Sequence, residues 1–190
     1  ATLKGAAQRG MRLFYGDAGC ADCHAGPFQT DHQFHAMGTV QIGPGKAATF
    51  EDHHRDEGRF LVTGNPADRF AFRTPSLRTV ALTGPYGHAG AHERLSDYIT
   101  AHVDPITELK SFDTSSVSLP AFDADDFAIM TDPVEVAALA DAVHIAPQSL
   151  TPSEVPDLTA FLESLTDVTA IEGRLGVPDT VPSGLTVPQV

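Results

Sequence analysis

Apolar residues recur at helical spacing in several separate segments of the chain. From Leu3 to Tyr15, apolar and small residues return every three or four positions, which predicts a helix with one face suited to burial. A second segment, His92–His102, places Leu95, Tyr98 and Ile99 on one face together with its last residue. Both segments are therefore expected to pack one side against a core.

Two further helices are predicted from their capping signals. Asp132 precedes a proline and is followed three residues later by a glutamate, so a helix is expected from there to about Val143. Thr151 begins the same arrangement, and that helix is expected to reach about Leu165. Pro156 lies inside this last segment, where its missing N–H is expected to bend the first turn.

Long stretches between these segments show no regular spacing of apolar residues. Residues 25–73 are rich in Gly, Pro and His and are predicted to form ordered loops with short turns. Residues 106–127 are rich in Ser, Thr and Asp and are expected to form an acidic, insertion-like loop. Residues 167–190 contain several Pro and Gly and are expected to form an extended tail. The fold class predicted is a mostly α domain over residues 1–166, with long ordered loops and hardly any sheet.

Composition and charge narrow the class of partner. The chain of 190 residues has 12 basic and 25 acidic residues, a net charge of −13 that argues against nucleic acid as a partner. It has no run of about 18 apolar residues, so no membrane span is predicted. From residue 96 to 190 there are sixteen acidic and two basic residues, so this half is expected to attract a partner with a basic face.

The strongest chemical signal is the pentapeptide Cys20-Ala21-Asp22-Cys23-His24. It contains the only two cysteines of the chain, and this spacing is the attachment pattern of haem c. The two thiols would form thioethers with the haem vinyl groups, and His24 would be the proximal iron ligand. The sequence therefore predicts one covalent haem c.

Three other interpretations of the cysteine pair were weighed. A thioredoxin-like redox pair lacks the strand and βαβ context that it needs. A zinc site would need two more ligands, which His32 and His35 could offer at loose spacing. A structural disulfide would not require the adjacent His24. Haem c explains all three residues, and because it is attached outside the cytoplasm, an exported, periplasmic protein with its signal peptide already removed is expected.

The other face of the iron has several candidate ligands. His102 continues the apolar face of its predicted helix, and a haem must be covered by such a face, so His102 is the distal ligand expected from periodicity. Met37, in the loop after the cysteine motif, is its rival.

A set of motifs after the cysteine pair resembles the C-terminal haem domain of the bacterial di-haem cytochrome c peroxidases, a family that includes the MauG-like enzymes. The match runs from about residue 5 to residue 166. The motifs are, in chain order, Gly26-Pro27, Thr30-Asp31, Phe34-His35, Gly38, Asp56–Phe60, Val62–Pro66 and Phe72–Gly90. The fold that the resemblance implies is a cytochrome-c-like helical haem domain.

The resemblance also implies roles for particular residues. In the family, the distal ligand of this haem follows the Pro-Tyr-x-His-x-Gly motif and is Met in ordinary peroxidases and Tyr in MauG-like enzymes; aligned from His88, that position is His102. The family binds calcium partly through backbone carbonyls, and Thr83 and Pro85 are the matching positions. Arg73 and Arg78 are expected to contact the haem propionates.

Departures from the family pattern lie at two positions. Ala89 stands where the family usually has an acidic residue, and Thr79 stands where it has Asn.

The leading functional hypothesis is an electron-relay haem domain of a di-haem peroxidase-like oxidoreductase. The resemblance implies a second haem-bearing domain or chain that reacts with peroxide and a small soluble protein that donates electrons. Because only one attachment motif is present, the chain resembles the C-terminal half alone. The alternatives are a free-standing periplasmic electron carrier, and a MauG-like module that oxidises a protein side chain. Tyr98, on the same face as His102, keeps the last of these open.

Overall fold

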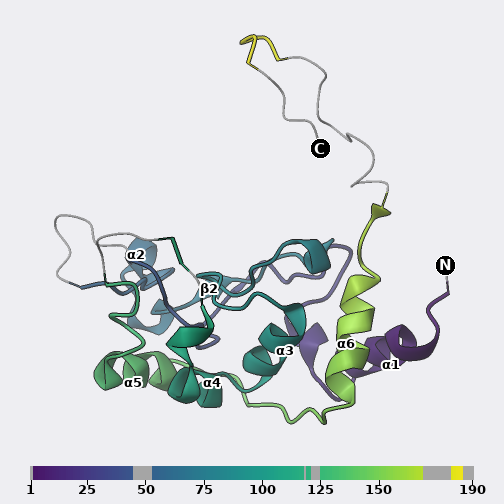
Figure 1. Cartoon of the computed structure of the whole chain (residues 1–190), viewed down its shortest axis with the longest axis horizontal. Helices are drawn as coiled ribbons and strands as arrows, with labels where there is room; N and C mark the ends of the chain where they lie inside the picture. The colour runs from purple at the N-terminus through teal and green to yellow at the C-terminus, as the bar shows by residue number, and fades with distance from the viewer. Residues whose placement is uncertain (1, 45–52, 118, 121–124, 169–180, 186–190) are drawn as a thin grey trace.

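The computed structural model describes residues 2–44, 53–117, 119–120, 125–168 and 181–185 (Figure 1). Its regular structure is mainly helical. The α-helices are α1 (Gly5–Phe14), α2 (Phe60–Thr63), α3 (Leu95–Val103), α4 (Pro105–Ser111), α5 (Pro133–Asp141) and α6 (Glu154–Glu163). Short 3-10 turns are η1 (Cys20–Asp22), η2 (Pro66–Asp68), η3 (Val80–Leu82) and η4 (Thr114–Ser116).

The sheet content is minimal, as the sequence predicts. Strands β1 (Phe34–His35) and β2 (Phe72–Arg73) form one antiparallel pair, with Phe34 opposite Arg73. Long ordered loops join the elements, so the prediction of a mostly helical domain with long loops is confirmed. Most of the predicted tail, 167–190, lies outside the described residues. Within the described residues, no helix is long and apolar enough to cross a membrane.

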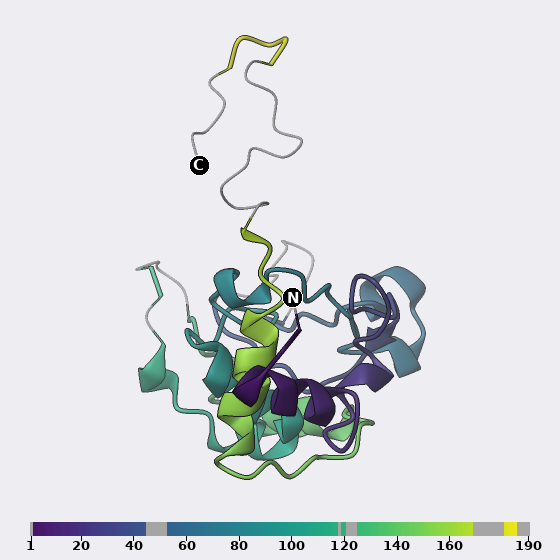
Figure 2. The ribbon, with the colours of Figure 1, turned by 90° about the vertical axis from the view of Figure 1, so that its right-hand side faces the viewer.

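Helices α1 and α6 lie against each other at one end of the molecule, with α3 beside them (Figures 1 and 2). Helices α1 and α6 meet at Gly10, where a side chain would run into the backbone of Asp157 on α6. Phe14 and Phe161 then pack with their ring centroids 5.1 Å apart. The buried residues of this first core cluster are Phe14, Ala18, Tyr86, Leu95, Ile99, Leu158, Phe161 and Leu162.

A second core cluster lies around α4 and α5. Leu109 and Leu139 are 2% and 1% exposed, so both helices are held by their apolar faces. The buried residues of this cluster are Val40, Phe70, Ala91, Leu109, Ile129 and Leu139. Val40, Phe70 and Ala91 lie outside the helices, so this cluster joins loop segments to α4 and α5.

The expectation that residues 106–127 form a loop is wrong for their first part. Residues 105–111 form α4, and η4 follows closely. Asp104 accepts a hydrogen bond from the Thr107 N–H at 3.3 Å, and Pro105 occupies the first helical position. A helix this short gives little periodic signal. Residues 118 and 121–124 of the predicted loop lie outside the described residues.

The start of α6 also differs from the prediction. The helix begins at Glu154, three residues after Thr151, although the Glu154 side chain does accept hydrogen bonds from the Thr151 N–H and hydroxyl. Pro156 consequently falls in the first turn, where backbone N–H groups have no partner within the helix. Its missing donor therefore costs little, and the bend expected from it is not required.

The start predicted for α3 at His92 is also too early, because His92 exchanges backbone hydrogen bonds with Tyr86.

An ion pair closes the contact between α1 and α6. Arg9 donates two hydrogen bonds of 2.6 Å to the Asp157 carboxylate, and this guanidinium lowers the pKa of Asp157 below its ordinary value. The pair therefore stabilises the fold above the ordinary carboxyl pKa of about 4, and this stability is lost as the pH falls through the lower, folded-state pKa. Asp157→Asn is expected to flatten the pH dependence of the free energy of unfolding below about pH 4, measured by chemical denaturation. An unchanged pH profile would contradict this assignment.

Candidate haem site

The two cysteines and His24 are brought to one side of a single helical turn. Gly19 immediately precedes η1 and has a left-handed φ of 63°. After the turn, the His24 N–H donates a hydrogen bond of 2.9 Å to the Cys20 carbonyl. A turn of this kind places residues three and four apart side by side. The two thiols therefore flank the same surface as the imidazole, which is the arrangement that two thioethers and an axial ligand on one haem require.

Burial acts on the thiols of both cysteines. Burial raises the pKa of Cys20 to about 11, and burial together with nearby Asp31 raises the pKa of Cys23. They form no disulfide with each other. The raised thiol pKa values do not favour a redox-active pair, because the reactive thiol of such a pair has a lowered pKa.

The orientation of His24 is set by a backbone acceptor. Its Nδ1 lies 3.1 Å from the carbonyl oxygen of Gln29, and because a carbonyl can only accept, Nδ1 must carry the proton. Gln29 has a positive φ of 50° and donates its side-chain N–H to the Tyr15 hydroxyl at 3.2 Å. Burial lowers the pKa of His24, so its ring is held neutral with a lone pair on Nε2.

His102 lies opposite this ring. The centroids of the His24 and His102 rings are 6.3 Å apart, with the ring planes inclined by 57°. Imidazole nitrogens bind metals at about 2.0–2.1 Å, and a five-membered ring of bonds near 1.33 Å has a radius of about 1.1 Å. Two such bonds and two ring radii span about 6 Å, so the separation accommodates one metal ion between the two imidazoles.

The surroundings of His102 keep it uncharged. Burial, together with the neighbouring His24, lowers its pKa to about 4. Tyr98, one turn earlier on α3, has its ring centroid 5.2 Å from that of His102, and burial raises the pKa of this phenol to about 12. A neutral imidazole is the form that binds iron. The donor set therefore fits a haem c with two thioethers and two axial histidines.

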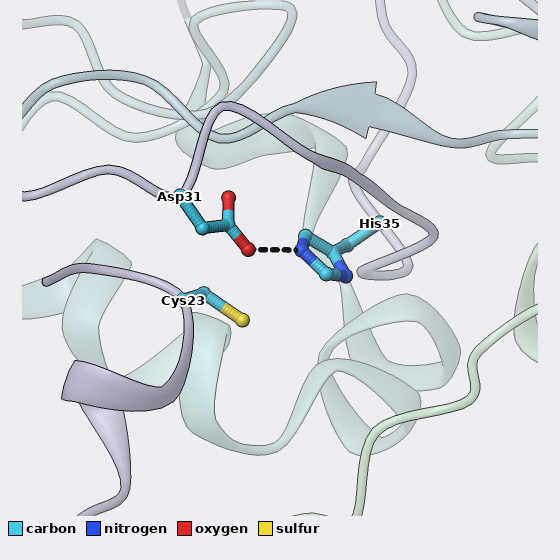
Figure 3. A group of neighbouring side chains, drawn as sticks. All are labelled: Cys23, Asp31 and His35. Carbon is cyan, nitrogen blue, oxygen red and sulfur yellow. Dashed lines mark hydrogen bonds and ion pairs between the residues drawn. The ribbon is translucent and has the colours of Figure 1, made fainter.

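A second group of ligand-type side chains lies next to Cys23. Its thiol, the carboxylate of Asp31 and the ring of His35 face one another in Figure 3, with ligand atoms all within 4.8 Å. His35 Nε2 and Asp31 Oδ2 are 2.8 Å apart. Burial opposes ionisation of Asp31, but hydrogen bonds from His35, Gln33 and Thr74 lower its pKa to about 2.

This group does not complete the zinc site considered from the sequence. It supplies three ligand atoms from the described residues, whereas structural zinc takes four, and it leaves Cys20 unused. Of the two histidines that the sequence offers as zinc ligands, His35 lies near the cysteine motif. The Nδ1 of His32 instead lies 3.3 Å from an Arg73 guanidinium nitrogen. Asp31 was not among the predicted ligands. Its N–H donates to the Cys23 carbonyl, a contact that carries no sequence signal of its own.

The remaining predicted site residues are exposed at the surface. Arg73 is exposed and donates to the Thr74 carbonyl at 3.3 Å, while the Arg78 guanidinium lies 5.7 Å above the Phe28 ring. Neither of them forms an ion pair with a described residue. Thr83 and Pro85 are exposed on either side of the cis Gly84–Pro85 bond. Contacts of the arginines with propionates, and of the two carbonyls with calcium, stay predictions.

Curated proteins are similar to part of this chain. No family model matches the chain. It is 37% identical over 118 residues to the cytochrome-c peroxidase IdrP1 of Denitromonas iodatirespirans, covering 52% of this chain and 31% of that protein. It is 42% identical over 84 residues to the methylamine utilization protein MauG of Methylorubrum extorquens, covering 44% of this chain and 21% of that protein.

Solved structures give the same result over nearly the whole chain. A MauG-like protein associated with microbial copper homeostasis matches with a TM-score of 0.59 and 30% identity, covering 92% of this chain and 50% of that one. The diheme peroxidase BthA of Burkholderia thailandensis shares the fold, with a TM-score of 0.61 at 23% identity, covering 100% of this chain and 48% of that one.

These findings define the class of protein. The chain is homologous to one part of the di-haem cytochrome c peroxidases and MauG, and the resemblance stated from the sequence motifs is confirmed. The relatives are named as haem-containing oxidoreductases, and this chain is similar to one part of them. The chain spans about a third or less of these two curated relatives and about half of the solved neighbours.

Proposed function

We propose that this chain is the electron-relay haem domain of a di-haem peroxidase-like oxidoreductase, with a cytochrome-c-like fold. The observation that carries the proposal is the pair of neighbouring imidazoles, His24 and His102, whose ring centroids are 6.3 Å apart, next to the two cysteines. A haem iron bound by both imidazoles would have no ligand position left for peroxide. Relay is therefore the role that this centre supports, and reaction with peroxide belongs to another haem.

Each residue of the centre has a defined task in this proposal. A bound haem c supplies reversible one-electron transfer. Cys20 and Cys23 fix it covalently, and His24 is held in one tautomer by the Gln29 carbonyl at 3.1 Å. His102 is half-buried on α3 and its lowered pKa keeps it neutral, so it can act as a ligand without losing a proton first. Two imidazole ligands give a lower reduction potential than His with Met, since a thioether favours the reduced metal.

The wider assembly is proposed from the resemblance to the relatives rather than from residues of this chain. We propose that the peroxide-reacting haem lies on a second domain or chain, that a small soluble protein with a basic face donates electrons, and that the protein works in the periplasm. Calcium bound through the carbonyls of Thr83 and Pro85 is part of the same proposal. Copurification of a second haem polypeptide would distinguish this assembly from a free-standing electron carrier.

The experiment that tests the relay role is spectroscopy of the ferric protein and of His102→Met. The unmodified protein is expected to give a low-spin bis-histidine EPR signal and no reaction with hydrogen peroxide at this haem. His102→Met is expected to stay low-spin, with a different signal and a raised reduction potential. A high-spin, peroxide-reactive haem in the unmodified protein would overturn the relay role.

A second candidate function is favoured by one observation. Tyr98 lies next to His102, with ring centroids 5.2 Å apart, and a tyrosine ligand would make the chain a MauG-like module. In that case the ferric protein would show a tyrosinate charge-transfer band that Tyr98→Phe abolishes. His102→Met would then leave the spectrum unchanged, which separates the two candidates.

A further inference from the structure

A small cavity is lined by His102 and by other residues of α3 and α4. It has a volume of about 20 Å³, whereas a single water molecule needs about 10–15 Å³ and two to four polar partners. His102, His92, Tyr98 and Glu108 all line it, so the cavity is large enough and polar enough for one water molecule. The rest of its lining is largely apolar and includes Met37, Val40, Ala91 and Pro105.

The two imidazoles of the centre differ in how they are oriented. His24 donates from Nδ1 to the Gln29 carbonyl. No side-chain hydrogen bond ties His102 to any of the described residues, although metal-bound histidines almost always donate their second ring N–H to a carbonyl, a carboxylate or water. An acceptor for His102 is therefore to be sought in the cavity that its ring lines.

The cavity contains a carboxylate that can serve this purpose. Glu108 Oε1 on α4 lies 3.5 Å from His92 Nε2, and these two side chains are 25% and 12% exposed. His92 is fixed by two backbone hydrogen bonds with Tyr86, of 2.6 Å and 3.1 Å. Its ring lies 5.5 Å from that of Tyr98, which in turn contacts His102. The pair therefore occupies a defined place beside the proposed ligand.

We propose that Glu108, aligned by His92, is a positioning residue for His102 and receives its second ring N–H through one water molecule in this cavity. The inference rests on the proposed function, because it takes His102 as an axial ligand. A carboxylate that accepts this hydrogen bond makes the imidazole a stronger donor to iron and stabilises the ferric state. Glu108 would thus hold the reduction potential of this centre low.

The test compares two charge-removing variants by redox titration and EPR. Glu108→Gln removes the charge inside the cavity. Asp97→Asn removes an equal charge from α3 itself, at a side chain that is 58% exposed and does not line the cavity. Glu108→Gln is expected to raise the reduction potential and alter the EPR g-values, and Asp97→Asn is expected to leave the g-values unchanged and move the potential far less. Equal shifts in both variants would reduce the effect to long-range charge and overturn the proposal.

Three further checks separate a loss of the fold, or a failure of bis-histidine ligation, from a failure of this proposal. If Glu108→Gln loses the helical circular dichroism of the native protein, His92→Gln is used, and an unchanged potential and EPR signal in that variant overturns the proposal. A crystal structure of the haem-loaded protein should place a water molecule between His102 and Glu108, and a direct bond from His102 to a backbone carbonyl would contradict it. The EPR signal of the unmodified protein is read first, so failure of bis-histidine ligation is recognised separately.

Discussion

His102→Ala is expected to convert the ferric haem from low-spin to predominantly high-spin and to make it react with peroxide and cyanide. The reason is geometric. The centroids of the His102 and His24 rings are 6.3 Å apart, and alanine at position 102 leaves the space of the His102 ring without a nitrogen ligand. Added imidazole is expected to restore the low-spin spectrum by occupying the same space. Electronic absorption and EPR spectra with and without imidazole measure both effects.

The matched control is His144→Ala, which removes an exposed histidine at the start of the loop after α5. It is expected to leave the spin state unchanged. If His102→Ala itself stays low-spin, another side chain has taken the position. Met37 lines the cavity beside His102 and is the first candidate, so a raised potential that is lost in the His102→Ala/Met37→Leu double variant would identify it.

The parts of the fold that could be predicted from the sequence are those specified by neighbouring residues. Asp132 accepts the hydrogen bond from the Val134 N–H at 2.8 Å, and α5 follows as its capping signal indicates. The apolar periodicity of α1 likewise predicts its buried face. The hydrogen bonds between Thr151 and Glu154 that the capping signal predicts are present, but residues 152–153 form a turn, so α6 begins two residues later than Pro152.

Two features of the centre had no sequence signal. Gln29 contributes a backbone carbonyl, which every residue has, and its position depends on a left-handed φ that glutamine rarely adopts. Glu108 and His92 are 16 residues apart and lie on different elements. By contrast, the cysteine motif is read within five consecutive residues. Periodicity and the family resemblance both singled out His102, and the structure places it beside His24, while its role as a ligand stays a prediction.

The close approach of α1 and α6 gives the largest expected effect on stability. By helix propensity alone, Gly10→Ala would stabilise α1 by about 1 kcal/mol. The structure predicts the opposite sign, because the added Cβ would run into the Asp157 backbone and lie 2.9 Å from the Phe161 Cβ. A backbone carbonyl cannot rotate away, so the helices must separate and loosen the packing of Phe14 on Phe161. We expect a net loss of about 2 kcal/mol in the free energy of unfolding, within the range for overpacked cores.

Guanidinium unfolding followed by circular dichroism measures this loss in the haem-loaded protein. The matched control is Arg12→Ala, at an exposed position of the same helix, which is expected to change stability by less than about 0.5 kcal/mol. Because propensity and packing predict opposite signs at Gly10, a stabilised Gly10→Ala variant would show that α1 and α6 are not in contact at this point. A destabilised variant with an unchanged haem spectrum would show instead that this contact supports the fold that surrounds the centre without setting its ligands.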